Sequence, residues 1–522
     1  MNKLAGFFWN TTIYKIVTIC VMILTPSYVL CAFPQPFTAA LLLWGAAILL
    51  HDLFTKKNFL KQTGTLLLIL FCVGYAISIL FFGENDLFST IHLYCWTIVE
   101  FLLLFAVDGK DSFSPQTLLR ELYTINFSIS VVTLLTGAVS LFCFLLRVSA
   151  TLPDLEGVNG IWFLGVVNGR NSGIFNNPIS CANAMFVGCA ASLYNLVYPK
   201  RKKWYAIAGY IATFAVCLLS VITTLTRTYV YGAYIMVFAA AFIAAFQWFL
   251  RKGHKVFLRL TFSAIAAIAI TCLLIGGAEA GKSAITTVST KIPAMDMQFL
   301  VDFFDNNYTP DPDATKPNEP DSENPDDQKK PSVIIGGYVN TTLVRDELER
   351  LPNFFYPRNE LWKVALQVIP HSPVFGFTTG NRQSSSLAYG STPYFYAYEP
   401  VGIITYHNAY FDIAVSAGLL GLGLILAFLG LQILRTLKVA FSKKLSTLQH
   451  REVWGLSVVV GYLATHVVIT CMFLGALCLT NSSVCIYFWI LLGYVSRIND
   501  QLMGDRAVLS GENILRKIIK RK

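Results

Sequence analysis

The chain has 522 residues, of which 55% are hydrophobic and only 13% are charged, and its formal net charge is +10. Soluble domains carry about 25% charged residues, so this composition excludes an ordinary soluble protein. The Lys and Arg residues gather in short loops between apolar runs, which is typical of membrane-topology signals and argues against a nucleic-acid partner.

Apolar runs recur from one end of the chain to the other, and about 20 helical residues are enough to cross the ~30 Å hydrocarbon core of a bilayer. Hydropathy therefore predicts an all-α polytopic membrane protein with about twelve transmembrane helices. No clear cleavage site follows the first run, so we expect a retained helix there. The predicted spans lie near 13–33, 36–53, 64–82, 89–107, 123–146, 178–197, 205–223, 229–250, 259–276, 408–434, 454–476 and 483–498.

The loop charges predict the orientation of these spans. The short connections near 34, 82–88 and 477–482 contain no Lys or Arg, whereas the alternate connections are basic. Since positive charge is retained on the cytoplasmic side, both termini are expected in the cytoplasm. The turn that holds Arg227 is the one short loop that departs from this rule.

The same pattern divides the chain into four parts. Spans 1 to 9 occupy 1–276, a large extracytoplasmic loop occupies 277–406, spans 10 to 12 occupy 407–498, and a basic cytoplasmic tail occupies 499–522. Within the loop, the acidic insert 305–331 is nearly free of apolar side chains, so we expect it to be disordered. Its Asp311-Pro312-Asp313 resembles a metal-binding pair, but solvated charge is the favoured interpretation.

Two outer segments have recognisable local signals. Leu, Phe, Trp and Tyr return at helical spacing over 333–403, which predicts short surface helices near 346–350 and 359–368. The other long outer segment, 148–177, carries glycines and asparagines that predict a series of turns near the membrane surface.

Cofactor and metal sites are not indicated. All twelve Cys residues lie in or beside apolar segments, which is typical of small buried side chains and of neither a disulfide framework nor a metal site. The sequence has no P-loop, dinucleotide fingerprint or HExxH motif. We therefore expect a protein that uses no cofactor and no metal.

Four polar residues at the predicted outer membrane edge are candidates for chemistry, because charge is costly there. Arg227 lies where the seventh span ends, Arg170 lies in the first long outer loop, Arg358 precedes an amphipathic helix, and His407 directly precedes the tenth span. Guanidinium groups suit phosphate oxygens, and imidazole suits proton transfer near neutrality. Taken singly, each has a structural alternative: a snorkelling or solvated Arg, or a polar group at a helix edge.

Other conspicuous residues have structural explanations. His371 lies between two prolines and is expected in a turn, and Asn177 and Pro178 suit a cap and a first helical turn. Gly418 and Gly421 are spaced to permit close helix packing.

The ordered motifs are Arg170-x-x-Gly173-x-Phe175-x-Asn177-Pro178, Thr226-Arg227, Arg358…Trp362…Pro370…Gly376, His407-Asn408-x-Tyr410 and Gly418-x-x-Gly421. In this order and with the large outer loop, they resemble the O-antigen ligase and polymerase family of bacterial envelope glycosyltransferases. The resemblance covers roughly 160–425.

The resemblance implies transfer of glycan from a polyprenyl diphosphate carrier to an acceptor hydroxyl, at the outer face of the bacterial cytoplasmic membrane. It implies that neither a nucleotide sugar nor a metal is needed. It also implies that further polysaccharide-assembly proteins act as partners. Arg227 and Arg358 would hold the diphosphate as negative charge gathers on it, and His407 would orient or deprotonate the acceptor. The residues expected to contact substrate are Arg170, Trp362, Asn408 and Tyr410.

Two positions depart from the family pattern: Thr226 stands where Ser is frequent, and Ser416 stands where many members carry an acid. An acid that supports the His in relatives would therefore be missing here. The first functional interpretation is a polymerase of capsule, exopolysaccharide or O-antigen repeat units, and the second is a ligase to an acceptor such as lipid A core. A flippase would predict polar groups within the spans and internal repeats, and neither is evident in the sequence. A non-catalytic scaffold would leave the grouped Arg and His residues unexplained.

Overall fold

The computed structural model describes residues 6–28, 30, 34–55, 57–82, 86–107, 114–152, 162–167, 169–198, 203–293, 295, 358–390, 405–504 and 507–512. The predicted disordered insert 305–331 and the predicted helix at 346–350 lie outside these residues.

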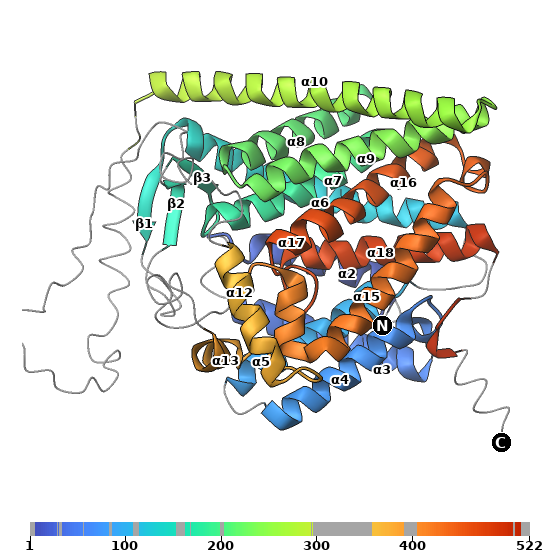
Figure 1. The fold of residues 1–522 in the computed structure, drawn as a ribbon. Helices are drawn as coiled ribbons and strands as arrows, with labels where there is room; N and C mark the ends of the chain where they lie inside the picture. The colour runs from blue at the N-terminus through green and yellow to red at the C-terminus, as the bar shows by residue number, and fades with distance from the viewer. Residues whose placement is uncertain are drawn as a thin grey trace, which may run out of the picture.

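A helix forms at each of the twelve predicted spans (Figure 1). Ten of the described helices are long and apolar enough to cross a membrane, which confirms an all-α polytopic membrane protein. The count of twelve stays a prediction, because α2 has only 14 residues and α18 becomes polar towards its C-terminal end. The helices are α2 (Thr11–Leu24), α3 (Pro34–Phe54), α4 (Thr65–Phe82), α5 (Leu87–Val99) continued by η2 (Glu100–Leu104), α6 (Pro115–Leu145), α7 (Pro178–Val197), α8 (Trp204–Thr223), α9 (Arg227–Arg251), α10 (Val256–Lys291), α15 (Ala409–Ala440), α16 (His450–Thr465) continued by η5 (His466–Thr470) and α17 (Cys471–Phe473), and α18 (Ser483–Met503).

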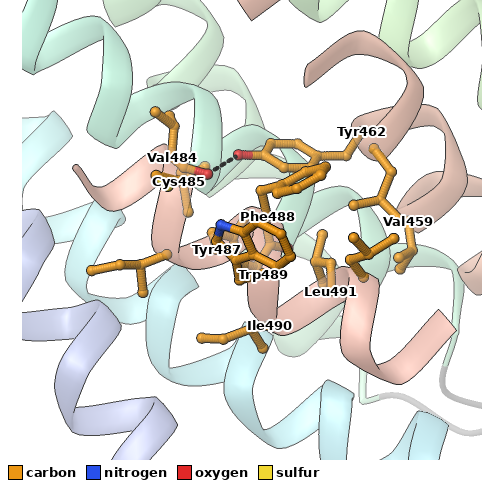
Figure 2. Close-up of a cluster of buried hydrophobic side chains, with 14 of the residues drawn as sticks. Val459, Tyr462, Val484, Cys485, Tyr487, Phe488, Trp489, Ile490 and Leu491 are labelled. Atoms are coloured by element: carbon orange, nitrogen blue, oxygen red, sulfur yellow. Dashed lines mark hydrogen bonds between the residues drawn. The ribbon is translucent and has the colours of Figure 1, made fainter. Parts of the chain in front are cut away.

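Helix α18 forms the centre of the bundle. It packs against α2, α6, α7, α15 and α16, and nearly all of its side chains are buried. Figure 2 shows Tyr487, Phe488 and Trp489 of α18 beside Tyr462 of α16, whose hydroxyl donates to the Val484 carbonyl over 3.2 Å. Side chains on every side of α18 are buried, polar ones towards its C-terminal end included, so α18 is enclosed by other helices.

Helix α10 has the opposite character. It packs on α9 along one side of the bundle (Figure 1), and its described side chains are buried only at Ser263, Ala267, Ala278 and Ser289. The small buried residues permit close approach to α9, while the apolar remainder faces outwards. The predicted boundary at residue 276 falls inside this helix, which continues to Lys291.

The segment before α7, which was predicted to lie outside the membrane, forms a small antiparallel sheet, and this corrects the expectation of turns alone. Its strands are β1 (Ser149–Leu152), β2 (Trp162–Val167) and β3 (Arg170–Gly173), paired in the order β1-β2-β3. The glycines serve this sheet: Gly169 has φ +71° in the turn between β2 and β3, and Gly165 has φ +84° at an irregularity in the register. Such angles favour glycine, so the turn signals mark hairpin turns and a bulge. The chain then enters α7 through an Asn177 cap and Pro178, as predicted.

Three further elements lie with the sheet at one end of the helices (Figure 1): α12 (Arg358–Val368), η3 (Ile369–His371) and α13 (Arg382–Tyr389). Helix α12 confirms the predicted amphipathic helix at 359–368. It buries Leu361, Val364 and Val368 against Phe377 and Tyr406. His371 was expected in a turn, and it is the last residue of the short 3₁₀ helix η3.

Gly418 breaks α15, so it does more than permit helix packing as the sequence suggested. Its angles, φ +70° and ψ −179°, are non-helical. The backbone of the inserted segment (373–378) fills the break: Leu419 N–H donates to the Pro373 carbonyl over 2.7 Å, and Phe377 N–H donates to the Val415 carbonyl over 2.7 Å. The groups that the interrupted helix leaves unpaired thus find partners in the 373–378 segment.

Replacing Gly418 with alanine is expected to destabilise the protein by roughly 3 kcal/mol or more, because the backbone conformation is essentially restricted to glycine and a Cβ would collide with the Val374 carbonyl. The matched control is Gly423→Ala in the same helix, where a Cβ would meet nothing within 4 Å. That change should be neutral or stabilise by up to about 1 kcal/mol. Thermal unfolding in detergent measures both, and equal melting temperatures would contradict the role of the break.

Candidate functional site

Arg170 and Arg227 come together at the turn between α8 and α9. From β3, Arg170 donates Nε–H to the Thr224 carbonyl over 2.9 Å and Nη2–H to the Thr226 hydroxyl over 3.1 Å. The neighbouring Asn171 amide donates to the Thr223 hydroxyl over 3.0 Å. The sheet therefore fixes the turn that presents Arg227.

Arg227 is the first residue of α9 and is half-buried. The cap residue Thr226 makes no side-chain hydrogen bond to the helix, so its hydroxyl serves Arg170 instead of the first-turn N–H groups. The helix N-terminus carries partial positive charge. Together with the guanidinium of Arg227, it favours an anion at this end of α9.

A second group forms where α12 meets the start of α15. Arg358 places its guanidinium carbon 5.4 Å from the ring centroid of Phe473. Trp362, one turn along α12, donates its indole N–H to the Tyr406 carbonyl over 3.2 Å and lies 6.0 Å from the ring of Phe411. Cation–π contact and ring packing thus hold α12 over the residues that precede α15.

His407 lies between these contacts and the first turn of α15. It adopts φ +49°, an uncommon conformation for a residue other than glycine. Asn408 caps the helix by accepting from the N–H groups of Tyr410 over 3.0 Å and Phe411 over 3.3 Å. Within the described part of the chain, no group forms a hydrogen bond to the His407 imidazole.

Electrostatics keep this imidazole neutral. Burial lowers the pKa of His407 from its ordinary value of 6.5, and the positive charge of Arg358 lowers it further, whereas the charge of Asp412 opposes both. A neutral imidazole at neutral pH can accept a proton, which is the form that a general base requires.

The 466–475 segment connects the two groups. Turn η5 packs on α9 and α17 packs on α15, while the Tyr410 hydroxyl donates to the Val467 carbonyl over 2.8 Å. At the end of this segment, Gly475 packs closely against α15: a Cβ there would lie 2.5 Å from the Asp412 carboxylate. The end of α9 that begins at Arg227 and the end of α15 that follows His407 therefore rest against the same short segment.

The predicted site residues thus fall into two groups: Arg170 with Arg227, and Arg358, Trp362, Asn408 and Tyr410 around His407. Several atoms expected to contact substrate already have protein partners. The Asn408 oxygen caps α15, the Trp362 N–H and Tyr410 hydroxyl bind backbone carbonyls, and Arg170 holds the α8–α9 turn. These residues support the cationic and imidazole groups, whatever further contacts they make with a substrate.

Sequence reasoning missed two charged residues of this region, Arg382 and Asp412. They form a buried ion pair, with Arg382 Nη1 lying 3.5 Å from Asp412 Oδ1. Arg382 Nε–H also donates to the hydroxyl of Ser416 over 2.6 Å, so the residue at the position that departs from the family pattern binds this Arg. The available signal was the spacing of Asp412 and Ser416, which are four apart and therefore lie on one helix face.

No group of three or more His, Cys, Asp or Glu side chains that could hold a metal ion occurs among the residues described.

Residues 212–426 match the family model described as O-antigen ligase. This match supports an O-antigen ligase/polymerase family for the chain. No curated protein matches it. The matched region contains Arg227, Arg358, His407, Asp412 and Gly418 and stops within α15, whereas Arg170 precedes it. The family is one of membrane glycosyltransferases of the ligase and polymerase type, which agrees with a multi-pass helical protein.

Proposed function

We propose that the protein polymerises polyprenyl-diphosphate-linked oligosaccharide repeat units into a surface polysaccharide, at the outer face of the bacterial cytoplasmic membrane. The main support is that Arg358 lies beside the half-buried His407 and contacts Phe473, while α9, which begins at Arg227, packs on the adjoining η5. Cations suit a diphosphate, and a neutral imidazole suits a hydroxyl.

In the proposed step, the acceptor hydroxyl oxygen attacks the anomeric carbon of the donor glycan. The bond from that carbon to the diphosphate oxygen breaks, and its electron pair leaves with the polyprenyl diphosphate. His407 receives the acceptor proton, while Arg227 and Arg358 stabilise the charge that grows on the leaving group. The chain's own groups thus supply both the base and the stabilisation of the leaving group.

A ligase is the second candidate, favoured by the description of the matching family model. A ligase would use the same donor chemistry and move finished glycan to a terminal acceptor such as lipid A core. Polymerase and ligase therefore differ in the acceptor that occupies the site beside His407.

Transfer by the purified full-length protein tests the proposal. The donor is a synthetic polyprenyl-diphosphate-linked repeat unit, supplied without nucleotide and with excess chelator, and products are resolved by size. A ladder of longer lipid-linked glycans is the expected result. A single product that forms only after lipid A core is added would show that the protein is a ligase and not a polymerase.

Absence of both products from folded protein would overturn glycan transfer. Movement of a labelled lipid-linked glycan across the membrane of proteoliposomes would then support the flippase. Heat-unfolded protein is the negative control for the transfer and translocation assays.

A further inference from the structure

The ion pair of Arg382 and Asp412 is enclosed in protein. The two side chains are only 10% and 6% exposed, and Arg382 additionally binds Ser416. The position of Arg382 is fixed from the membrane helices, because Thr379 N–H donates to the Tyr75 hydroxyl over 2.9 Å and Gly380 N–H donates to the Thr90 hydroxyl over 2.9 Å. Helices α4 and α5 therefore hold the start of α13, and Arg382 connects α13 to α15.

Asp412 connects this pair to the residues around His407. Its Oδ1 accepts from the Tyr406 N–H over 3.0 Å, and its Oδ2 accepts from the Thr405 hydroxyl over 3.0 Å. The Thr405 oxygen in turn accepts from the His407 N–H over 3.2 Å. One carboxylate thus ties together the three residues that precede the Asn408 cap.

This arrangement matters because His407 has a left-handed backbone conformation. Such a conformation costs free energy in a non-glycine residue and persists only where the surroundings hold it. Asp412 and Thr405 supply that restraint directly through the backbone of 405–407. Arg382 pairs with the carboxylate and orients it, since an unpaired buried charge is unfavourable.

Resting on the proposed function, we propose that Asp412 and Arg382 are positioning residues that hold the His407 imidazole for deprotonation of the acceptor hydroxyl. Neither residue contacts the reacting atoms. Asp412 acts through the 405–407 backbone and through its negative charge, and Arg382 acts through Asp412.

The charges facing His407 predict how its pKa should change when Asp412 is replaced. Among the described residues they are Arg358 from α12 and Asp412 from α15, with Arg382 of α13 behind Asp412. Arg358 lowers the pKa of His407 and Asp412 raises it. Removing the charge of Asp412 therefore lowers that pKa further, and the acidic limb of the rate profile should move to lower pH.

The test measures transfer by the full-length protein from about pH 5 to about pH 9, the range in which His titrates. In Asp412→Asn we expect kcat to fall by about 100-fold, because small misplacements of a reacting group cost this much. The acidic limb should shift to lower pH. In Thr405→Val, which keeps the charge but removes the hydroxyl, kcat should fall without any shift of the limb.

The matched control is Asp500→Asn, which breaks the buried Arg435–Asp500 pair at the other end of α15, where the two groups lie 2.8 Å apart. That variant should lose stability and keep the wild-type pH profile. An equal shift in Asp500→Asn, or an unchanged kcat and limb in Asp412→Asn, would overturn the inference. If Asp412→Asn does not fold, an unchanged kcat in Thr405→Val would overturn it as well.

A second readout separates this inference from the proposed function. Carbethoxylation of His407 by diethyl pyrocarbonate, followed across pH by mass spectrometry, reports its protonation without any substrate. If wild-type protein transfers no glycan, the proposed function fails. If the His407 profile does not move between wild type and Asp412→Asn, the inference on Asp412 fails, whether or not transfer occurs.

Discussion

Replacing His407 with alanine is expected to lower the rate of glycan transfer by about 10²–10⁴-fold, the usual contribution of a general base. The reason is local: the half-buried imidazole is kept neutral by burial and by Arg358, and removing it leaves the acceptor proton without a nearby base. Steady-state transfer from a lipid-linked donor measures the effect. The amount of folded protein in the membrane should remain unchanged, since no described residue relies on this ring for a hydrogen bond.

His371→Ala is the matched control. Its ring stacks on Tyr389 with centroids 4.0 Å apart, and it belongs to the same outer layer of short helices. Transfer should be close to wild type in this variant. Equal losses in both histidine variants would indicate a general disturbance of the layer, and full activity in His407→Ala would remove His407 from the reaction.

Arg358→Ala carries the second largest expected effect, a loss of about 10²–10³-fold in kcat, comparable to removal of one preorganised group that stabilises developing charge. The guanidinium lies at the start of α12 above Phe473 and beside His407. Arg358→Lys should recover only part of the rate, because an ammonium keeps the charge but loses the planar fork.

Lys363→Ala on the same helix is the control for charge alone. Lys363 pairs with Glu360 over 2.7 Å and is well exposed, so its removal should change transfer little. If Lys363→Ala and Arg358→Ala lose activity equally, the net charge of the outer layer matters and the placement of Arg358 does not. If Arg358→Ala keeps wild-type kcat, the diphosphate is held elsewhere.

The flippase alternative gains one observation from the fold. Ionisable side chains are buried within the helices, among them Lys15, which donates to the Ala106 carbonyl over 2.6 Å, and Glu100, which accepts from the Cys485 thiol over 3.3 Å. The expectation that the spans carry no such groups is therefore wrong. Buried charge often marks a transport pathway, which is why translocation is measured alongside transfer.

Polar contacts between distant segments were beyond prediction from the sequence. Arg382 and Asp412 are 30 positions apart and look individually like a loop Arg and a helix Asp. They meet because a segment at 373–378 enters the break at Gly418 and brings α13 over the first turn of α15. No local pattern encodes that encounter, since it depends on where two chain segments pack.

The amino-acid sequence is enough to predict the membrane class, helices at the predicted spans, the cap at Asn177 and the amphipathic helix after Pro357. Each of these follows from residue type, hydropathy or helical period, which act over a few neighbouring residues. Three other features depend on the packed fold: the segment before α7 forms a sheet, Gly418 opens α15, and Asp412 binds the residues before His407. These features rest on backbone pairing and buried charge between segments far apart in the chain, and such contacts exist only once the bundle has packed.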